Sequence, residues 1–346
     1  MSRTLGRTGI EVTAIGLGTS GLGRGIAPGS PEERAAVDLA TAMLSGGRTI
    51  DTSNEYAGGR SEPVLGLAVP AVPDAASRIV TKVDRDPETG AFDRGRVLRS
   101  YEESLRRLGV DRVRLLHLHD PYTVSFEEAV APGGALAGML ELRDSGAVDA
   151  IGIAAGPIPL MTRYVDTGAF DVVLSHNRFT LVDRSASALF ENARARGMGV
   201  INAAPFGAGI LATGAGAATG AATETDATTG ALTGPVAETN TAGATPTGPK
   251  PPSYGYRPAS AALQEWARRA EAVCTAHGAT LRAAALRFST RSPLVDMTVV
   301  GVSSIHRLAQ LDALEGEAIP DDLWAEMDAL GPAPTPIDDD APGGAG

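Results

Sequence analysis

Eight short apolar runs recur along the chain and alternate with longer amphipathic stretches, a rhythm that constrains the fold more than any other feature. The runs are continuous and rich in β-branched residues, as expected for strands that are buried on both faces. They lie at residues 14–19, 49–52, 78–82, 112–119, 149–154, 171–175, 200–204 and 297–301.

The stretches between the runs carry helix signals. Residues 30–45 begin with Ser30 and Pro31, a favourable start because serine caps free amides and proline fits the first turn. Residues 93–109 begin at Asp93 and stop at Gly109. Further helices are expected at residues 133–146, 184–197, 260–278 and 303–316. The alternation predicts an α/β fold, a closed parallel (β/α)8 or TIM barrel. An open doubly wound sheet is the weaker alternative, because no GxGxxG motif enters a helix in the first unit.

Three segments depart from this rhythm. Residues 4–12 predict an N-terminal β-hairpin with a turn between Gly6 and Gly9. Residues 213–248 consist mainly of Ala, Gly and Thr, without aromatic residues, lysine or arginine, and predict a disordered insertion after the seventh strand. Residues 331–346 predict a disordered tail. We therefore expect one barrel domain over residues 1–330.

Charge and composition exclude several classes of function. A net charge of −11 disfavours binding to nucleic acid and to anionic membranes. The single cysteine, Cys274, excludes an internal disulfide framework and a cysteine-rich zinc site. No apolar run approaches the ~18 residues of a membrane span, and the N-terminus lacks a hydrophobic signal core. We expect a cytoplasmic protein that acts on a small molecule.

Polar residues stand at the ends of three consecutive predicted strands. Asp51 ends the second strand and Tyr56 follows it, Lys82 ends the third strand, and His119 ends the fourth. Taken singly, each has an ordinary structural explanation: a loop cap, a packed ring, a solvated charge or a core histidine. Because the active sites of such barrels lie at the C-terminal ends of the strands, we expect the four side chains to meet in one site.

These four groups suit proton transfer at an oxygen. A phenol with a pKa of ~10 is a poor acid or base at neutral pH, and a nearby ammonium group lowers that pKa. A carboxylate beside the lysine keeps it charged, and the imidazole can orient a substrate oxygen. The set predicts carbonyl/alcohol interconversion, in which a bound cofactor exchanges the hydride.

The blocks that carry these residues resemble the aldo-keto reductase family. They are, in order, LGRTGIEVTAIGLGT near the N-terminus, DTSNEYAGGRSEPVLG at 51–66, IVTKV at 79–83 and LLHLHDP at 115–121. The resemblance implies a barrel that binds NAD(P) without a Rossmann fold. It also implies that Tyr56 is the general acid/base, that Lys82 and Asp51 tune it, and that His119 orients the carbonyl.

The same resemblance implies where the coenzyme binds. Arg307 stands where a phosphate-contacting arginine is usual; it either holds the 2′-phosphate of NADP or is a solvated cation at the start of a helix. GVSS at 301–304 offers backbone donors at a helix N-terminus, which suit a phosphate. The expected coenzyme is NAD(P), with NADP slightly favoured over NAD. The expected coenzyme contacts are Gly18, Thr19, Asp51, His176, Ala204, Pro205, Phe206, Gly207, Gly301, Ser303 and Arg307. The chain departs from the family pattern where the family often has a Ser-Asn pair, a stacking Tyr, a Lys and an Asn: it carries Ala154-Ala155, Ala203, Gly301 and Leu311.

Other blocks resemble the aldose 1-dehydrogenase branch, which acts on fucose-like or galactose-like sugars and has relatives that act on pyridoxal. These blocks are NAAPFGAGIL at 202–211 and SYGYRPA at 253–259. The resemblance implies oxidation of a cyclic sugar to a lactone. Tyr254 and Tyr256 are candidates to stack on the sugar, with surface packing as the alternative.

Three other functions remain open. The chain could be a general aldehyde, ketone or pyridoxal reductase, or a coenzyme-binding redox sensor without turnover. A metal-dependent hydrolase is less favoured. His117 and His119 share one strand face, but the remaining histidines lie elsewhere in the sequence. We therefore expect no metal.

Overall fold

Eight parallel strands close into a barrel in this computed structural model, which describes residues 2–214 and 252–339. Strand β12 pairs with both β9 and β3 and so closes the circle. The strands are β3 (Ile15–Gly18), β4 (Ile50–Asp51), β5 (Ile79–Val83), β6 (Leu115–His119), β7 (Ala150–Ala155), β8 (Val172–His176), β9 (Gly199–Ala203) and β12 (Met297–Gly301). Each falls within or beside one of the apolar runs, so the predicted barrel is confirmed and the open sheet is excluded.

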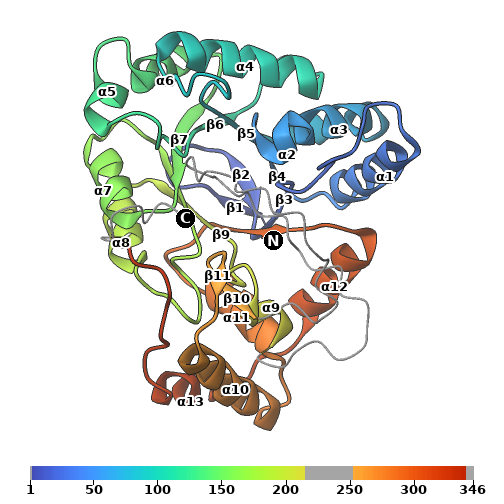
Figure 1. The fold of residues 1–346 in the computed structure, drawn as a ribbon, viewed down its shortest axis with the longest axis vertical. Coiled ribbons are helices and arrows are strands. Elements are labelled where there is room, and N and C mark those ends of the chain that lie inside the picture. The colour runs from blue at the N-terminus through green and yellow to red at the C-terminus, as the bar shows by residue number, and fades with distance from the viewer. Residues whose placement is uncertain (1, 215–251, 340–346) are drawn as a thin grey trace, which may run out of the picture.

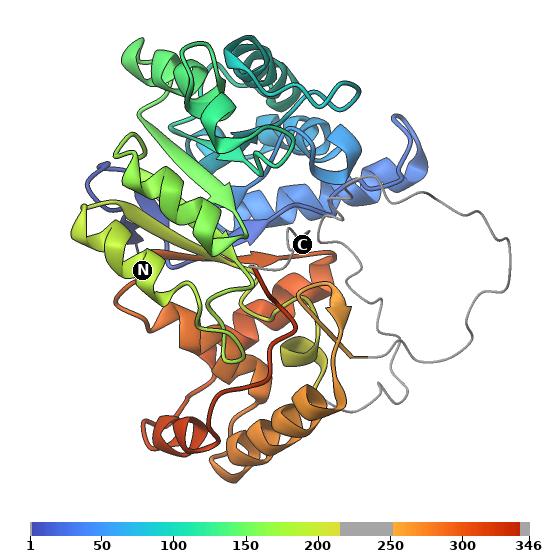
Figure 2. The same cartoon turned by 60° about the vertical axis from the view of Figure 1, so that its left-hand side comes forward.

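Helices surround the strands, as Figures 1 and 2 show from two directions. The outer layer consists of α1 (Pro31–Ser45), α3 (Ser61–Ala68), α4 (Arg94–Leu108), α6 (Ala135–Asp144), α7 (Ile158–Asp166), α8 (Ser187–Ala195), α11 (Leu281–Thr290) and α12 (Ile305–Gly316). The short elements in the connections are α2 (Tyr56–Gly59), α5 (Phe126–Val130), α9 (Ile210–Thr213), β10 (Ser253–Tyr254) and β11 (Arg257–Pro258).

The helix starts follow the expected capping chemistry. The Ser30 hydroxyl accepts a hydrogen bond from the Glu33 amide at the start of α1, and the Asp93 carboxylate accepts one from the Arg96 amide at the start of α4. Gly109 ends α4 with a φ of 66°, a left-handed conformation that glycine adopts without strain.

The expected helix at 260–278 forms, but it is not part of the outer layer. It is α10 (Ala261–Ala276), and it packs with α13 (Leu323–Ala329) at the lower edge of Figure 1. The barrel helix in this unit is α11, which the sequence analysis did not single out. Helices α3 and α7 were not predicted from the sequence either, because they have only eight and nine residues and each contains a proline near its start.

The N-terminal hairpin closes one end of the barrel. Its strands are β1 (Ser2–Thr4) and β2 (Glu11–Thr13), and Leu5 and Ile10 between them join the apolar cluster inside the barrel. Gly6 has a φ of 52°, and a Cβ there would lie 2.2 Å from the amide nitrogen of Gly199. The opposite end of the barrel, where the C-terminal ends of the strands lie, is not covered by this hairpin and can hold an active site.

The described part of the tail packs against the barrel. The indole Nε1 of Trp266 donates to the Gly331 carbonyl, and the Thr335 hydroxyl donates to the Asp183 carboxylate. The prediction of a disordered tail is therefore wrong for residues 331–339. Residues 340–346, and the predicted insertion at 213–248 beyond Gly214, lie outside the described residues. Across the described ranges, no helix is long and apolar enough to cross a membrane.

Candidate active site

A buried ion pair forms the floor of the site. Lys82 Nζ on β5 lies 2.6 Å from Asp51 Oδ1 on the neighbouring β4 and also donates to the Thr52 carbonyl at 2.8 Å. The Lys82 and Asp51 side chains are 1% and 4% exposed. An ammonium group has three donors, so one remains for a group above the pair.

Tyr56 lies directly above this ammonium group. Its ring centroid is 4.4 Å from Lys82 Nζ, and the ring meets the edge of the His119 ring at 5.4 Å between centroids. Tyr56 begins α2, and the left-handed Ala57 turns the chain directly after it. The prediction that the four strand-end groups meet in one site is therefore matched by their positions.

The electrostatics of Tyr56 differ from the expectation. Burial raises the pKa of its phenol well above the usual value of 10.0, and the charges of Asp51, Asp120 and Asp84 raise it further. The expected lowering by Lys82 therefore does not prevail, because burial and the surrounding carboxylates together raise the pKa of the phenol. The phenol keeps its proton at neutral pH.

His119 is held by two aspartates that the sequence analysis missed. Its Nδ1 lies 2.6 Å from Asp84 Oδ1, and its Nε2 lies 3.4 Å from Asp120 Oδ2. Burial alone would lower the pKa of His119, but Asp84 and Asp120 together raise it. A signal for Asp84 was present, because side chains two residues apart in a strand share a face and Asp84 stands two residues after Lys82.

A buried polar network fixes the loop that carries Tyr56. Asn54 donates to the Ser100 carbonyl and the Ser104 hydroxyl on α4, and its amide oxygen accepts from Arg96. Arg107 donates to the Asn54 carbonyl at 2.8 Å. Helix α4 thereby sets the position of the residues directly before Tyr56.

The expected coenzyme residues lie around the other side of the barrel mouth. Gly18 ends β3 and His176 ends β8, whereas Gly301, Ser303 and Arg307 lie between the end of β12 and the first turn of α12. The loop after β9 carries four more, Ala204, Pro205, Phe206 and Gly207, while Thr19 directly follows β3 and Asp51 ends β4.

Some of these residues have structural roles as well. The Thr19 hydroxyl donates to the Asp51 carbonyl and accepts from Ser61, so it supports the buried ion pair. Gly207 makes room for Tyr254, since a Cβ at this position would lie 2.0 Å from the tyrosine ring. Burial and neighbouring cations lower the pKa of His176 to about 3, so this imidazole is neutral.

Two buried polar groups at the end of β8 remain open for a ligand. Ser175 Oγ and Asn177 Oδ1 find no hydrogen-bond partner within the described part of the chain. Buried polar groups are normally paired, so these two atoms are able to form hydrogen bonds with a ligand. They lie beside Ala154 and Ala155, the small residues at the end of β7.

The two tyrosines after the insertion differ in their surroundings. Tyr254 is fully buried, and its hydroxyl donates to the Asn177 carbonyl at 2.8 Å and lies 2.6 Å from the Thr180 hydroxyl. The expectation that it stacks on a sugar is therefore wrong. Tyr256 is 39% exposed and close enough to Tyr56 to influence its pKa, so it remains a candidate for substrate contact.

Two arginines meet near the start of α12. Both Arg307 and Arg282 donate to Gln310 Oε1, at 2.9 and 3.5 Å. Arg307 also lowers the pKa of the Arg282 guanidinium, as burial does. Neither arginine forms an ion pair with a carboxylate among the described residues, so this pair of cations is free to bind an anion.

The described residues contain no cluster of three or more His, Cys, Asp and Glu side chains that could hold a metal ion. His117, the other histidine of the proposed pair, is fully buried, and neither of its ring nitrogens finds a partner among these residues.

Known proteins with similar sequences belong to one family. The sequence profile of the aldo/keto reductase family matches residues 14–332. L-Galactose dehydrogenase from Arabidopsis thaliana is 28% identical over 337 residues, which cover 95% of this chain and 93% of that protein. D-threo-Aldose 1-dehydrogenase from a Pseudomonas species is 29% identical, and pyridoxal 4-dehydrogenase from Microbacterium luteolum is 27% identical; both matches cover 95% of this chain and 97% of the relative.

Solved structures share the fold. The holo form of the aldo-keto reductase AKR11C1 from Bacillus halodurans superposes with a TM-score of 0.69 at 19% identity, covering 96% of this chain and 97% of that one. Because the family profile spans nearly the whole barrel, this chain belongs to the aldo/keto reductase family and is an NAD(P)-dependent oxidoreductase.

Proposed function

We propose that this chain oxidises the anomeric carbon of a small cyclic aldose to a lactone, with NADP favoured over NAD. The observation that carries the chemistry is the buried Asp51–Lys82 pair under Tyr56, with the His119 ring in a T-shaped contact with the tyrosine ring. The names of two relatives, both dehydrogenases of aldoses, support the choice of substrate.

In this proposal the four residues handle the proton. Tyr56 Oη is the general base that takes the proton of the anomeric hydroxyl, and Lys82 helps to stabilise the phenolate. Asp51 keeps Lys82 charged, and His119 orients the reacting oxygen. Bound NAD(P) would supply the acceptor for the hydride of the anomeric carbon. The products are a lactone, reduced coenzyme and one proton.

The raised pKa of Tyr56 makes the rate of this oxidation depend on pH. The phenol is protonated at neutral pH, and oxidation requires the deprotonated form. The fraction of phenolate grows as pH rises, so the rate of oxidation should climb into the alkaline range.

The residues of the coenzyme side fit NAD(P). The open polar atoms of Ser175 and Asn177 suit a carboxamide, and the cations Arg282 and Arg307 suit a phosphate. Gly301 meets nothing within 4 Å at its Cβ position, which leaves space beside the backbone. An additional phosphate on NADP would be attracted by the two arginines, so we favour NADP.

Tyr256 is our candidate for substrate recognition. It is partly exposed near Tyr56, and an aromatic ring can pack on the apolar face of a sugar.

The test follows nicotinamide absorbance in both directions with both coenzymes. The substrates are L-fucose, D-arabinose and L-galactose for oxidation, and simple aldehydes and pyridoxal for reduction. Sugar-dependent formation of NADPH that increases at alkaline pH supports the proposal.

A second candidate is reduction of an aldehyde or pyridoxal. The raised pKa of Tyr56 favours it, because a phenol that keeps its proton is ready to donate to a carbonyl. Rapid reduction of aldehydes without oxidation of any sugar would replace the first proposal with this one. Tight coenzyme binding without turnover of any substrate would favour a redox sensor.

A further inference from the structure

Asp84 faces the reaction site but has no part in the scheme above. It directly follows β5, its side chain is buried, and its carboxylate receives three donors. They are His119 Nδ1 at 2.6 Å, the Ser53 hydroxyl, and the Glu55 amide at 2.9 Å. A carboxylate with three donors is held in one orientation.

The backbone around Asp84 is fixed as well. Its amide donates to the Ser100 hydroxyl at 3.1 Å, and its carbonyl accepts from Arg96 Nε at 2.9 Å. Both partners lie on α4, the helix that also holds the loop before Tyr56. Asp84 is therefore placed by the same rigid element as the tyrosine.

We propose that Asp84 is a positioning residue of this active site, which fixes a hydrogen on Nδ1 of His119 and so leaves Nε2 as the nitrogen that meets the substrate oxygen. The inference rests on the proposed contact between His119 and that oxygen. An ionised carboxylate can only accept, so Nδ1, which lies 2.6 Å from Asp84 Oδ1, must donate. Asp120 Oδ2 lies 3.4 Å from Nε2, beyond the usual hydrogen-bond distance, and does not fix a hydrogen there in the same way. The interaction with His119 and the hydrogen bonds from His119, Ser53 and Glu55 lower the pKa of Asp84 despite its burial, which keeps it ionised.

This arrangement ties the role of Nε2 to the charge of the ring. When His119 is an imidazolium, Nε2 carries a hydrogen and can donate to a carbonyl oxygen. When His119 is neutral, its hydrogen stays on Nδ1, and Nε2 can only accept from a hydroxyl group. Reduction therefore needs the cation, and oxidation needs the neutral ring.

The groups that face His119 come from several elements. The anionic neighbours are Asp84 and Asp120, which follow β5 and β6, and Glu55 before α2. The cationic or basic neighbours are Lys82 on β5, His117 on β6 and His176 on β8, and the Tyr56 ring contacts its edge. The two aspartates prevail and raise the pKa of His119. Nδ1 contacts the Asp84 carboxylate at 2.6 Å and the Ser53 hydroxyl at 3.1 Å. Asp84 is the charged partner of the two, so its removal affects both the charge and the tautomer.

The first measurement needs no catalysis. Protein labelled with 15N-histidine is titrated by NMR, and the His119 signals are assigned from a His119→Gln variant. We expect Nδ1 of His119 to carry a hydrogen throughout the titration, while Nε2 loses its hydrogen as the ring becomes neutral. A neutral ring with its hydrogen on Nε2 would overturn the inference while leaving the proposed reaction untouched.

The second measurement compares Asp84→Asn with Asp86→Asn. Asp86 lies on the same loop, and its carboxylate accepts hydrogen bonds from the Glu88 and Thr89 amides and the Thr89 hydroxyl of that loop. In the pH profile of kcat/KM, the titration of His119 produces one of the changes in rate. In Asp84→Asn we expect this limb of the profile to move to lower pH for both oxidation and reduction, so that kcat/KM for reduction at pH 8 falls by about tenfold. Asp86→Asn should leave the limb in place.

An unchanged limb in a folded Asp84→Asn variant would overturn the inference. If this variant does not fold, the NMR experiment on the wild-type chain still decides. Absence of turnover with every substrate would instead count against the proposed function, since the tautomer of His119 is read without substrate.

Discussion

In the half of the barrel mouth formed by β4, β5 and β6, a buried lysine and histidine pair with carboxylates on neighbouring strand ends, whereas in the half formed by β7, β8 and β9 a buried arginine pairs with the C-terminal tail. In the first half, Lys82 on β5 pairs with Asp51 on the adjoining strand β4. His119 on β6 pairs with Asp84, which directly follows the adjoining strand β5. In the second half, the buried guanidinium of Arg178 pairs at 2.6 Å with Asp339, which lies 161 residues away in the sequence.

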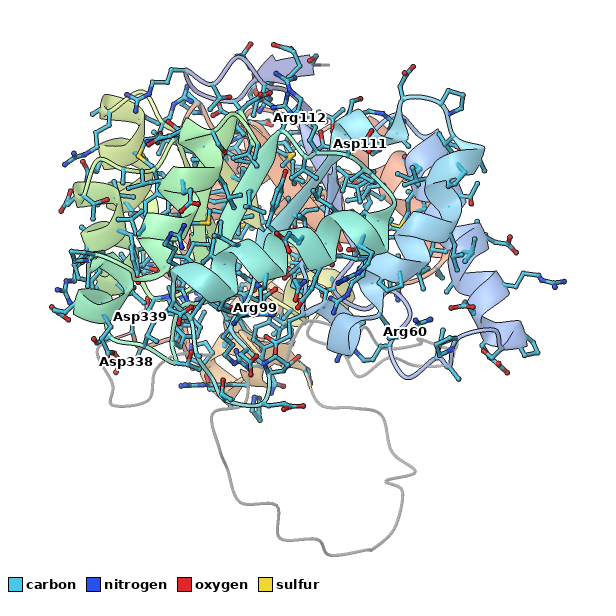
Figure 3. All side chains as sticks on the ribbon, turned by 90° about the horizontal axis from the view of Figure 1, so that it is seen from above. Arg60, Arg99, Asp111, Arg112, Asp338 and Asp339 are labelled. Carbon is cyan, nitrogen blue, oxygen red and sulfur yellow. The ribbon has the colours of Figure 1, made fainter. Side chains whose placement is uncertain are left out.

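The tail reaches this second half from outside the barrel. Asp339 also accepts a hydrogen bond from the Ile158 amide at the start of α7, where the helix dipole favours a negative charge. Figure 3 shows Asp338 and Asp339 together, away from Asp111 and Arg112, which precede β6 at the other end of the barrel.

The contrast separates chemistry from binding. In the first half, carboxylates on neighbouring strand ends hold Lys82 and His119 without any ligand, which suits groups that must keep a proton at a defined position. Other buried atoms of this half, namely Asp51 Oδ2, Asp120 Oδ1 and both ring nitrogens of His117, find no partner among the described residues. The second half contains the open polar atoms of Ser175 and Asn177 beside small residues, which suits a surface that a ligand completes. Variants in the first half should therefore affect turnover most, and variants in the second half should affect affinity or stability.

Tyr56→Phe should have the largest effect on turnover. It removes the hydroxyl that exchanges the proton while keeping the ring that contacts Lys82 and His119. We expect kcat to fall by about 10²–10⁴-fold. Coenzyme affinity, measured by fluorescence titration, should stay within a few-fold of the wild type. A Phe variant with near wild-type kcat would remove Tyr56 from the chemistry.

Lys82→Met should destabilise the fold, because it leaves the Asp51 carboxylate buried without its partner. Removing one member of a buried ion pair costs about 3–5 kcal/mol in the free energy of unfolding. Adding Asp51→Asn to Lys82→Met should recover part of this stability in urea unfolding, but it should not restore activity. If the double variant is no more stable than Lys82→Met alone, the ion pair between Lys82 and Asp51 does not contribute to stability as we expect.

The first half of the mouth was largely accessible from the sequence, because each of its groups stands at the end of a recognisable strand. Asp51, Lys82 and His119 follow from that position alone, and Asp84 could have been found from its two-residue spacing from Lys82. The direction of the Tyr56 pKa shift could not, because it depends on burial and on three carboxylates from different strand ends.

The second half was less accessible. Nothing local links Arg178 to Asp339, and the tail's proline, glycine and aspartate content is typical of a disordered segment. The helices around β7 and β9 were also missed, since α7 is short and α10 gave a stronger helix signal than the barrel helix α11.

Asp339→Ala tests the dependence on the tail. It removes the Asp339 carboxylate from the Arg178 guanidinium and should lower the free energy of unfolding by about 1–3 kcal/mol, less than at Lys82 because water can replace a departing tail. Asp328→Ala is the matched control: it breaks an ion pair to Arg184 whose two side chains are 51% and 62% exposed. Such exposed pairs contribute about 0–1 kcal/mol. If both variants lower the free energy of unfolding equally, the ion pair of the tail contributes no more to stability than an exposed ion pair does.

Arg307→Ala should have the smallest effect, confined to the choice of coenzyme. The guanidinium lies beside Arg282, both held by Gln310, and would attract the additional phosphate of NADP. Losing one such contact at a partly exposed site should raise KM for NADP by about tenfold, or ~1.4 kcal/mol, and leave KM for NAD nearly unchanged. Arg268→Ala is a control, since this arginine pairs with Glu265 on the outer helix α10. An equal rise in KM for both coenzymes would place Arg307 at a phosphate that NAD and NADP share, and would remove the structural basis for a preference.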